Sequence, residues 1–253
     1  MIRSLSIALV CFFFTLSPAV LAEEPLLKKG SRLLFIGDSI TDMGRDRRPN
    51  TRDQNHVLGH SYVFLIAAKL GIEMPAADLV FFNRGIGDNK ISDLRARWQE
   101  DAIALKPDML TILIGTNDVG AGLRNPEKTV TPERFESDYR AILDASRSAN
   151  PNLQLVLMDP FVLPSGDLSN ESAYAQRRAL TDAMRAVVAK LASEYDAIHI
   201  KTQDIFDTAL KQKPAAYWLW DGIHPLPQGH ELIARHWIER VRETYIKDRN
   251  FNY

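Results

Sequence analysis

Leu33-Leu34-Phe35-Ile36, followed directly by Gly37-Asp38-Ser39-Ile40-Thr41, is the stretch that decides the fold. The first four residues form a continuous apolar run, which is typical of a strand buried on both faces of a sheet. The glycine and aspartate that follow indicate a turn. A serine at the point where a buried strand ends in a turn is exposed yet rigidly held, as a nucleophile must be. Taken alone, however, Gly37-Asp38-Ser39 is more simply explained as a turn with a helix-capping residue.

Four further apolar runs repeat the pattern of a buried strand, at residues 79–82, 109–114, 153–158 and 198–200. Amphipathic stretches with helical spacing lie between and after them. Thr131 and Pro132 are expected to open one helix, Gly71 to end another, and Leu180 to lie on the apolar face of a third. This alternation predicts one doubly wound α/β domain, in which sites form beyond the carboxyl ends of the strands.

Residues 1–22 have the pattern of a signal peptide, with Arg3 before an apolar run at 7–16 and small residues spaced for cleavage after Ala22. The alternative is an uncleaved anchor. No later run reaches the length of a membrane span, so we expect no stable membrane insertion after cleavage and a single domain at 23–253. Cys11 is the only cysteine, so that domain has no disulfide. The sequence thus predicts a periplasmic or extracellular protein.

Acidic and basic residues almost balance, with a formal net charge of −1. Nucleic-acid-binding proteins usually carry a strong positive charge, so nucleic acid is not an expected partner.

Two loops carry groups that can hold a small anion. Asn83-Arg84-Gly85-Ile86-Gly87-Asp88 follows the second apolar run, and its glycines allow backbone N–H groups to point at one anion. Gly115-Thr116-Asn117-Asp118 closes the third run, and its neutral asparagine amide can stabilise an oxyanion without quenching a nearby base. The alternatives are a plain turn for the first loop and an asparagine bonded to its own backbone for the second.

Asp221-Gly222-Ile223-His224-Pro225 places a carboxylate three residues from an imidazole. On a turn this short, the carboxylate can reach Nδ1 of the ring and leave Nε2 free to face Ser39. A surface ion pair or half of a metal site are the alternatives. No second cluster of histidines and carboxylates has ligand spacing, so no metal is expected. The other histidines are scattered and interpreted as structural: His56, His60, His199, His230 and His236.

Together the four motifs resemble, in order, the blocks of the SGNH hydrolases, also called the GDSL lipase/esterase family. The resemblance spans most of the chain and implies a three-layer α/β/α sandwich with a five-stranded parallel sheet of flavodoxin-like topology. It implies a serine esterase that works through an acyl-enzyme without a cofactor or metal. Ser39 would be the nucleophile, His224 the base and Asp221 its orienting carboxylate.

The same resemblance implies an oxyanion hole built from the Asn117 amide and the backbone N–H groups of Ser39, Gly87 and Asp88. Asp88 is a departure, because it stands where the family usually has glycine. The donor there is a backbone N–H, which a side-chain change need not abolish, and Asp tolerates left-handed backbone. Its charge would nonetheless oppose an oxyanion unless the carboxylate turns away.

The substrate is less well determined by the sequence. A polar loop at 42–60 follows the nucleophile, and Tyr217, Trp218 and Trp220 lead into the Asp221 turn. Aromatic faces beside polar side chains suit a sugar ring, although the tryptophans could equally belong to the core. Asp38, Trp218 and Trp220 are the candidate substrate-binding residues.

The layout resembles exported bacterial family members that are assigned to carbohydrate deacetylation. The leading hypothesis is therefore removal of short acyl groups, acetyl above all, from carbohydrates, with a polysaccharide or a small-molecule ester as the substrate. A lipase, lysophospholipase or thioesterase of the same family and a catalytically silent glycan-binding protein are the alternatives.

Overall fold

The computed structural model describes residues 27–48 and 54–245, so the expected signal peptide lies outside the described residues. Its centre is a sheet of five parallel strands in the order β2-β1-β3-β4-β5. The bounds are β1 Arg32–Gly37, β2 Val80–Asn83, β3 Met109–Leu113, β4 Gln154–Met158 and β5 Ile198–Ile200. All five apolar runs therefore form strands, and the strand order is the flavodoxin-like one.

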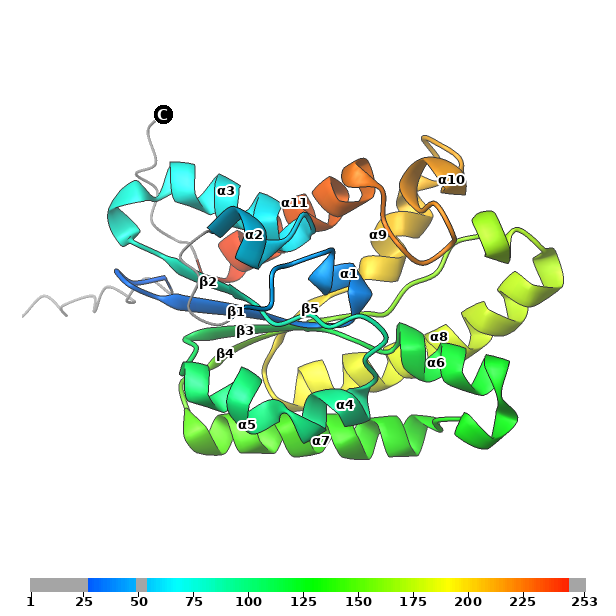
Figure 1. Cartoon of the computed structure of the whole chain (residues 1–253), viewed down its shortest axis with the longest axis horizontal. Helices are drawn as coiled ribbons and strands as arrows, with labels where there is room; N and C mark the ends of the chain where they lie inside the picture. The colour runs from blue at the N-terminus through cyan, green and yellow to red at the C-terminus, as the bar shows by residue number, and fades with distance from the viewer. Residues whose placement is uncertain (1–26, 49–53, 246–253) are drawn as a thin grey trace, which may run out of the picture.

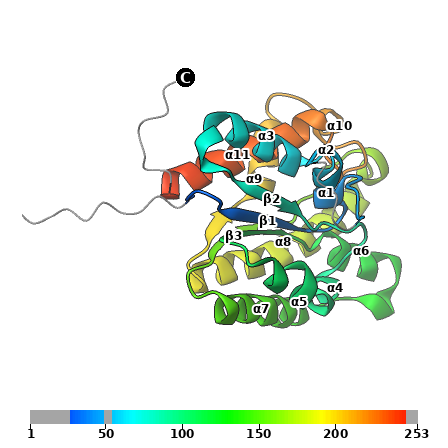
Figure 2. The same ribbon diagram turned by 60° about the vertical axis from the view of Figure 1, so that its left-hand side comes forward.

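Helices cover both faces of the sheet (Figures 1 and 2). On one face lie α2 Gln54–Leu58, α3 Tyr62–Glu73, α9 Thr202–Ala209, α10 Ala215–Trp218 and α11 Pro227–Tyr245. On the other lie α4 Ile91–Ala96, α5 Trp98–Asp101, α6 Thr116–Arg124, α7 Pro132–Ala149 and α8 Glu171–Glu194. One-turn helix α1, Ser39–Asp42, follows β1, and short 3-10 turns occupy Pro75–Ala77, Ile103–Leu105, Pro126–Lys128 and Gly166–Leu168. The expected three-layer α/β/α sandwich is confirmed.

Each face of the sheet has its own apolar core. On the α3 and α11 side, the fully buried Phe35 ring packs against Trp237, with ring centroids 5.3 Å apart. On the α7 side, Phe135 and Tyr139 pack edge to face at 5.6 Å. Consecutive side chains of a strand point alternately into the two cores. Because both cores are apolar, every position of the strand must be apolar, which explains the unbroken apolar runs.

The helix signals at Thr131 and Pro132 are confirmed, whereas those at Gly71 and Leu180 are not. Thr131 caps α7 by accepting a hydrogen bond from the Arg134 N–H, as expected, and Pro132 is the first helical residue. The prediction that Gly71 ends α3 is wrong, because the helix continues to Glu73 and stops before Pro75. Proline disfavours helical backbone in the residue before it, and this signal prevails over the glycine. Leu180 is 39% exposed on α8 and does not belong to the core.

All four motifs lie at the carboxyl-terminal edge of the sheet, three of them directly after strands. Residues that follow the carboxyl ends of β1, β2 and β3 lie there because the strands are parallel and adjacent. The Asp221 turn reaches this edge from the loop between α10 and α11. Within the described residues, no helix is long and apolar enough to cross a membrane.

Candidate active site

Ser39 is the first residue of α1 and follows β1 after a single intervening residue. That residue, Asp38, is the N-cap, and its Oδ1 accepts a hydrogen bond of 3.0 Å from the Ile40 N–H. Gly37 has no room for a side chain, because a Cβ would lie 2.2 Å from the carbonyl oxygen of Leu113. The sharp turn thus holds a partly exposed serine on a buried, tightly packed backbone.

Ser39, His224 and Asp221 form a continuous hydrogen-bonded chain. Ser39 Oγ lies 2.8 Å from His224 Nε2, and His224 Nδ1 lies 2.6 Å from Asp221 Oδ2. The other carboxylate oxygen accepts the backbone N–H groups of Ile223 and His224. A carboxylate at Nδ1 favours the tautomer with its proton there, so Nε2 is the acceptor for the serine hydroxyl.

The electrostatics of this pair suit a general base. The hydrogen bond from His224 to Asp221 raises the pKa of the imidazole more than burial lowers it, and the charges of Asp38 and Asp88 add to the rise. Burial alone would raise the pKa of Asp221, but the hydrogen bonds from the His224 ring and from two backbone N–H groups outweigh it and lower that pKa. The carboxylate therefore stays ionised beside the ring and favours its protonated form.

The expected oxyanion donors differ in whether their hydrogens are free. Among the described residues, the backbone N–H groups of Ser39 and Asp88 have no protein acceptor. The Gly87 N–H, in contrast, donates to Asp42 Oδ2 at 3.1 Å, so this expected donor is already engaged. Asn117 Nδ2 donates one hydrogen to the Asn89 carbonyl at 3.2 Å, which leaves its second amide hydrogen available.

Asp88 has a φ of 63°, in the left-handed region that favours glycine. This conformation gives a physical reason for a glycine at the position, and Asp is among the residues that tolerate it best. The side chain is exposed, and within the described chain it has no hydrogen-bond or ion-pair partner. Its charge is nevertheless close enough to contribute to the raised pKa values of His224 and Asp38.

Asp42 and Arg45, which the sequence reasoning did not single out, connect α1 to the loop after β2. Asp42 accepts the Gly87 N–H, and Arg45 Nε donates to the Gly85 carbonyl at 2.7 Å. Asn83 strengthens the connection, since its amide donates to the Thr41 carbonyl at 2.7 Å and its Oδ1 accepts the Gly85 N–H. Their proximity to Ser39 in sequence was the available signal, but it does not reveal these partners.

An open cavity of about 300 Å³ lies over Ser39. Its described lining comprises Ser39, Asp42, Met43, Gly44, His60, Trp220 and His224. Trp220 is 58% exposed and stacks against the His224 ring, with centroids 5.8 Å apart. Of the other expected substrate-binding residues, Trp218 is buried in the core and Asp38 is buried as a helix cap, so neither lines this cavity.

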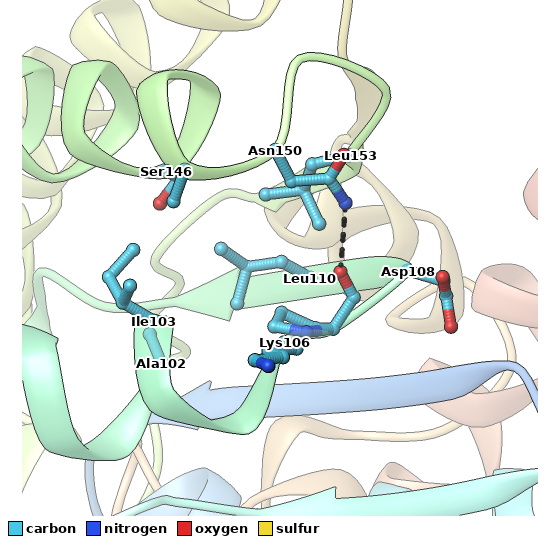
Figure 3. A pocket seen from close by; sticks show the side chains of 10 residues that line it. Ala102, Ile103, Lys106, Asp108, Leu110, Ser146, Asn150 and Leu153 are labelled. Atoms are coloured by element: carbon cyan, nitrogen blue, oxygen red, sulfur yellow. Dashed lines mark hydrogen bonds between the residues drawn. The ribbon is translucent and has the colours of Figure 1, made fainter.

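A larger cavity, of about 370 Å³, lies at the opposite end of the sheet, between α7 and the turn before β3 (Figure 3). Leu110, Ile103 and Leu153 contribute apolar side chains to it. Its one hydroxyl, on Ser146, already bonds the Trp98 indole and the Ile142 carbonyl. Among the described residues that line this cavity there is no serine–histidine–carboxylate chain like the one at the Ser39 edge.

Two buried carboxyls lie near the site. Burial raises the pKa of Asp38 and that of Asp118 to about 7. Asp118 accepts the Ile91 N–H and so ties α6 to α4. No group of three or more histidine, cysteine or carboxylate side chains within the described residues could hold a metal ion.

Comparison with known proteins gives one consistent result. The GDSL-like Lipase/Acylhydrolase family model matches residues 35–232. An acetylxylan esterase of Geobacillus stearothermophilus is 34% identical over 87% of this chain and 98% of its own length. A multidomain esterase of Ruminococcus flavefaciens is 26% identical over 56% of this chain, but the match spans only 16% of that protein.

Solved structures agree with the sequence matches. A GDSL-like lipase structure from Parabacteroides merdae is 40% identical and superposes with a TM-score of 0.79, covering 85% of this chain and 96% of the other. The acetylxylan esterase Axe2 of Geobacillus stearothermophilus is 34% identical, with a TM-score of 0.74 and coverage of 85% and 95%. The chain therefore belongs to the GDSL-like lipase/acylhydrolase (SGNH) family and is a carboxylic ester hydrolase.

Proposed function

We propose that the protein removes acetyl groups from carbohydrates through an acyl-enzyme on Ser39. The observation that carries the proposal is the hydrogen-bonded chain from Ser39 through His224 to Asp221, at 2.8 and 2.6 Å. These distances match what proton transfer from a serine to an oriented imidazole requires.

The mechanism follows from these groups. Ser39 Oγ attacks the ester carbonyl carbon while His224 Nε2 accepts the hydroxyl proton. The carbonyl oxygen becomes an oxyanion, which the N–H groups of Ser39 and Asp88 and the free Asn117 amide hydrogen stabilise. His224 then gives its proton to the leaving alcohol as the ester C–O bond breaks. Water repeats the sequence on the acetyl-serine and releases acetate.

The size and lining of the cavity support a short acyl group and a polar alcohol. Met43 and Trp220 are its apolar side chains among the described residues, whereas Asp42, His60 and His224 are polar. The exposed Trp220 ring offers a face for the C–H side of a sugar. The acetylxylan esterase relative, which matches over nearly its whole length, adds independent support for an acetylated glycan.

The proposal includes export of the enzyme from the cell. The signal-peptide pattern at residues 1–22 would deliver the domain at 23–253 to the periplasm or the medium. N-terminal sequencing of the processed protein tests this part: a start at Glu23 supports cleavage, and a start at Met1 refutes it.

The enzymatic test compares aryl acetate, butyrate and octanoate with acetylated xylo-oligosaccharides, for the wild type and Ser39→Ala. We expect acetate to be preferred, acetic acid to be released from the oligosaccharides, and both activities to disappear in the variant. Faster turnover of octanoate would favour the lipase or thioesterase alternative. Binding of the glycan without any turnover would favour the silent glycan-binding protein.

A further inference from the structure

Arg177, in the second turn of α8, is a nearly buried arginine that lacks an acidic partner. It is 7% exposed and packs over the first turn of α6, where Nη2 donates to the Thr116 carbonyl at 2.9 Å. Its Nε is fully enclosed and has no acceptor, and Nη1 also lacks one among the described residues. A buried guanidinium with unpaired N–H groups is costly, because those groups have lost their water.

A second guanidinium comes close to the first. A Cβ on Gly120 would lie 3.0 Å from Arg124 Nη1 and 3.2 and 3.3 Å from Nη2 and Nη1 of Arg177. Arg124, the last residue of α6, is exposed and likewise has no carboxylate partner in the described chain. The two guanidinium groups therefore pack together over Gly120, in the room that a side chain at this position would take.

The other two arginines of α8, unlike Arg177, are paired with carboxylates. Arg178 pairs with Asp182 and Asp207, and Arg185 is also held by carboxylates on three sides. In contrast, burial and then the charge of Arg124 lower the pKa of Arg177. Two like charges held together in this way are stabilised by an anion that bridges them, and the planar guanidinium fork matches a carboxylate.

The arginine pair belongs to the same edge of the molecule as the triad. The carbonyl that Arg177 binds is that of Thr116, and the next residue is Asn117, the expected oxyanion donor. The charge of Asp221 is also near enough to act on Arg177: it raises the pKa of the guanidinium, although burial and Arg124 lower that pKa overall. The two guanidinium groups pack over Gly120, which follows Asn117 by about one turn of α6, so a ligand group bound to them would lie near the expected oxyanion donor.

We propose that Arg124 and Arg177 form a subsite for a carboxylate on the glycan, that is, for a uronic acid residue near the acetylated sugar. This subsite rests on the proposed carbohydrate deacetylation and narrows its substrate to acidic glycans. The carboxylate would bridge Arg124 and the exposed part of the Arg177 guanidinium, and its charge would offset their repulsion.

The kinetic test uses two acetylated xylo-oligosaccharides that differ only in one glucuronic acid branch. The quantity measured is the ratio of their kcat/KM values, so that any general change in activity cancels. We expect the wild type to favour the acidic substrate about fivefold, as a partly exposed ion pair would give. Arg124→Gln should bring the ratio close to one, and Arg134→Gln, which removes an exposed arginine of α7, should retain it.

A wild-type ratio of one, or an unchanged ratio in Arg124→Gln, would overturn the subsite. If neither oligosaccharide is deacetylated although aryl acetate is, the proposed carbohydrate function fails, and the subsite is then judged by ligand-induced thermal stabilisation. Glucuronate should raise the Tm of the wild type and of Arg134→Gln but not that of Arg124→Gln. No stabilisation, or stabilisation by inorganic phosphate alone, would overturn the assignment to a carboxylate.

Discussion

Replacing Gly85 with alanine should move two of the expected oxyanion donors apart, the Ser39 N–H on α1 and the Asp88 N–H on the loop after β2. Gly85 packs against the backbone of α1, and a Cβ would lie 2.3 Å from the Asp42 nitrogen and 2.7 Å from the Thr41 carbonyl carbon. Ordinary contact begins at 3.4 Å, so the loop must move by about 1 Å relative to the helix that carries Ser39. Both atoms belong to the backbone and cannot rotate away, unlike the end of a flexible side chain.

The expected fall in kcat follows from this displacement of the loop. A misplacement of about 1 Å at a reacting centre costs roughly 10²-fold, and the loss of one oxyanion donor costs about 10²–10³-fold. We therefore expect kcat on aryl acetate to fall by about 10²-fold in Gly85→Ala. Overpacking should also lower the free energy of unfolding by about 1–3 kcal/mol.

The assay is kcat on aryl acetate at saturating substrate, together with urea unfolding to show that the variant is folded. Gly71→Ala is the matched control, because its Cβ would have no neighbour within 4 Å and the site lies in α3, away from the nucleophile. It should retain wild-type kcat. A folded Gly85→Ala enzyme with kcat within about threefold of the wild type would refute the reasoning, since a donor displaced by about 1 Å should not support normal turnover.

Three further outcomes are expected. Asn117→Ala should lower kcat on aryl acetate by about 10²–10³-fold with little change in KM, because the amide acts on the oxyanion; an equal rise in KM with kcat unchanged would place the amide in ground-state binding instead. The acid limb of the kcat/KM profile should lie above pH 6.5, since the hydrogen bond to Asp221 raises the pKa of His224 and only the neutral ring accepts the serine proton. Asp221→Asn should move this limb to lower pH and reduce kcat about 10⁴-fold, and a limb that does not move would contradict the assignment. Burial raises the folded-state pKa of Asp118 from 3.8 to about 7, so the folded state binds its proton more tightly and the free energy of unfolding should fall as pH rises through this window. Urea unfolding at pH 4 and pH 8 should show a smaller fall in Asp118→Asn, and an identical fall would exclude Asp118 as a cause.

Features that depend on short stretches of chain could be predicted from the sequence. The apolar runs predicted all five strands, because a strand covered on both faces needs apolar residues at consecutive positions. Thr131 and Pro132 predicted the start of α7, because capping is satisfied within one turn. The prediction from Gly71 was wrong because an exposed glycine can also lie inside a helix. Here Pro75, farther along the chain, determines where α3 ends.

Features that depend on contacts between distant segments were decided by the tertiary structure alone. The Gly87 N–H is engaged because Oδ2 of Asp42, the last residue of α1, lies 3.1 Å from the Gly87 nitrogen. Trp218 and Trp220 are two residues apart, yet one is 8% and the other 58% exposed, since α10 ends at Trp218 and the chain continues in an extended conformation at Leu219. The convergence of Arg124 and Arg177 arises from the packing of α6 against α8. The sequence therefore determined which chemical groups the site contains, whereas the packing of the segments determined which of their hydrogens and charges are free to act.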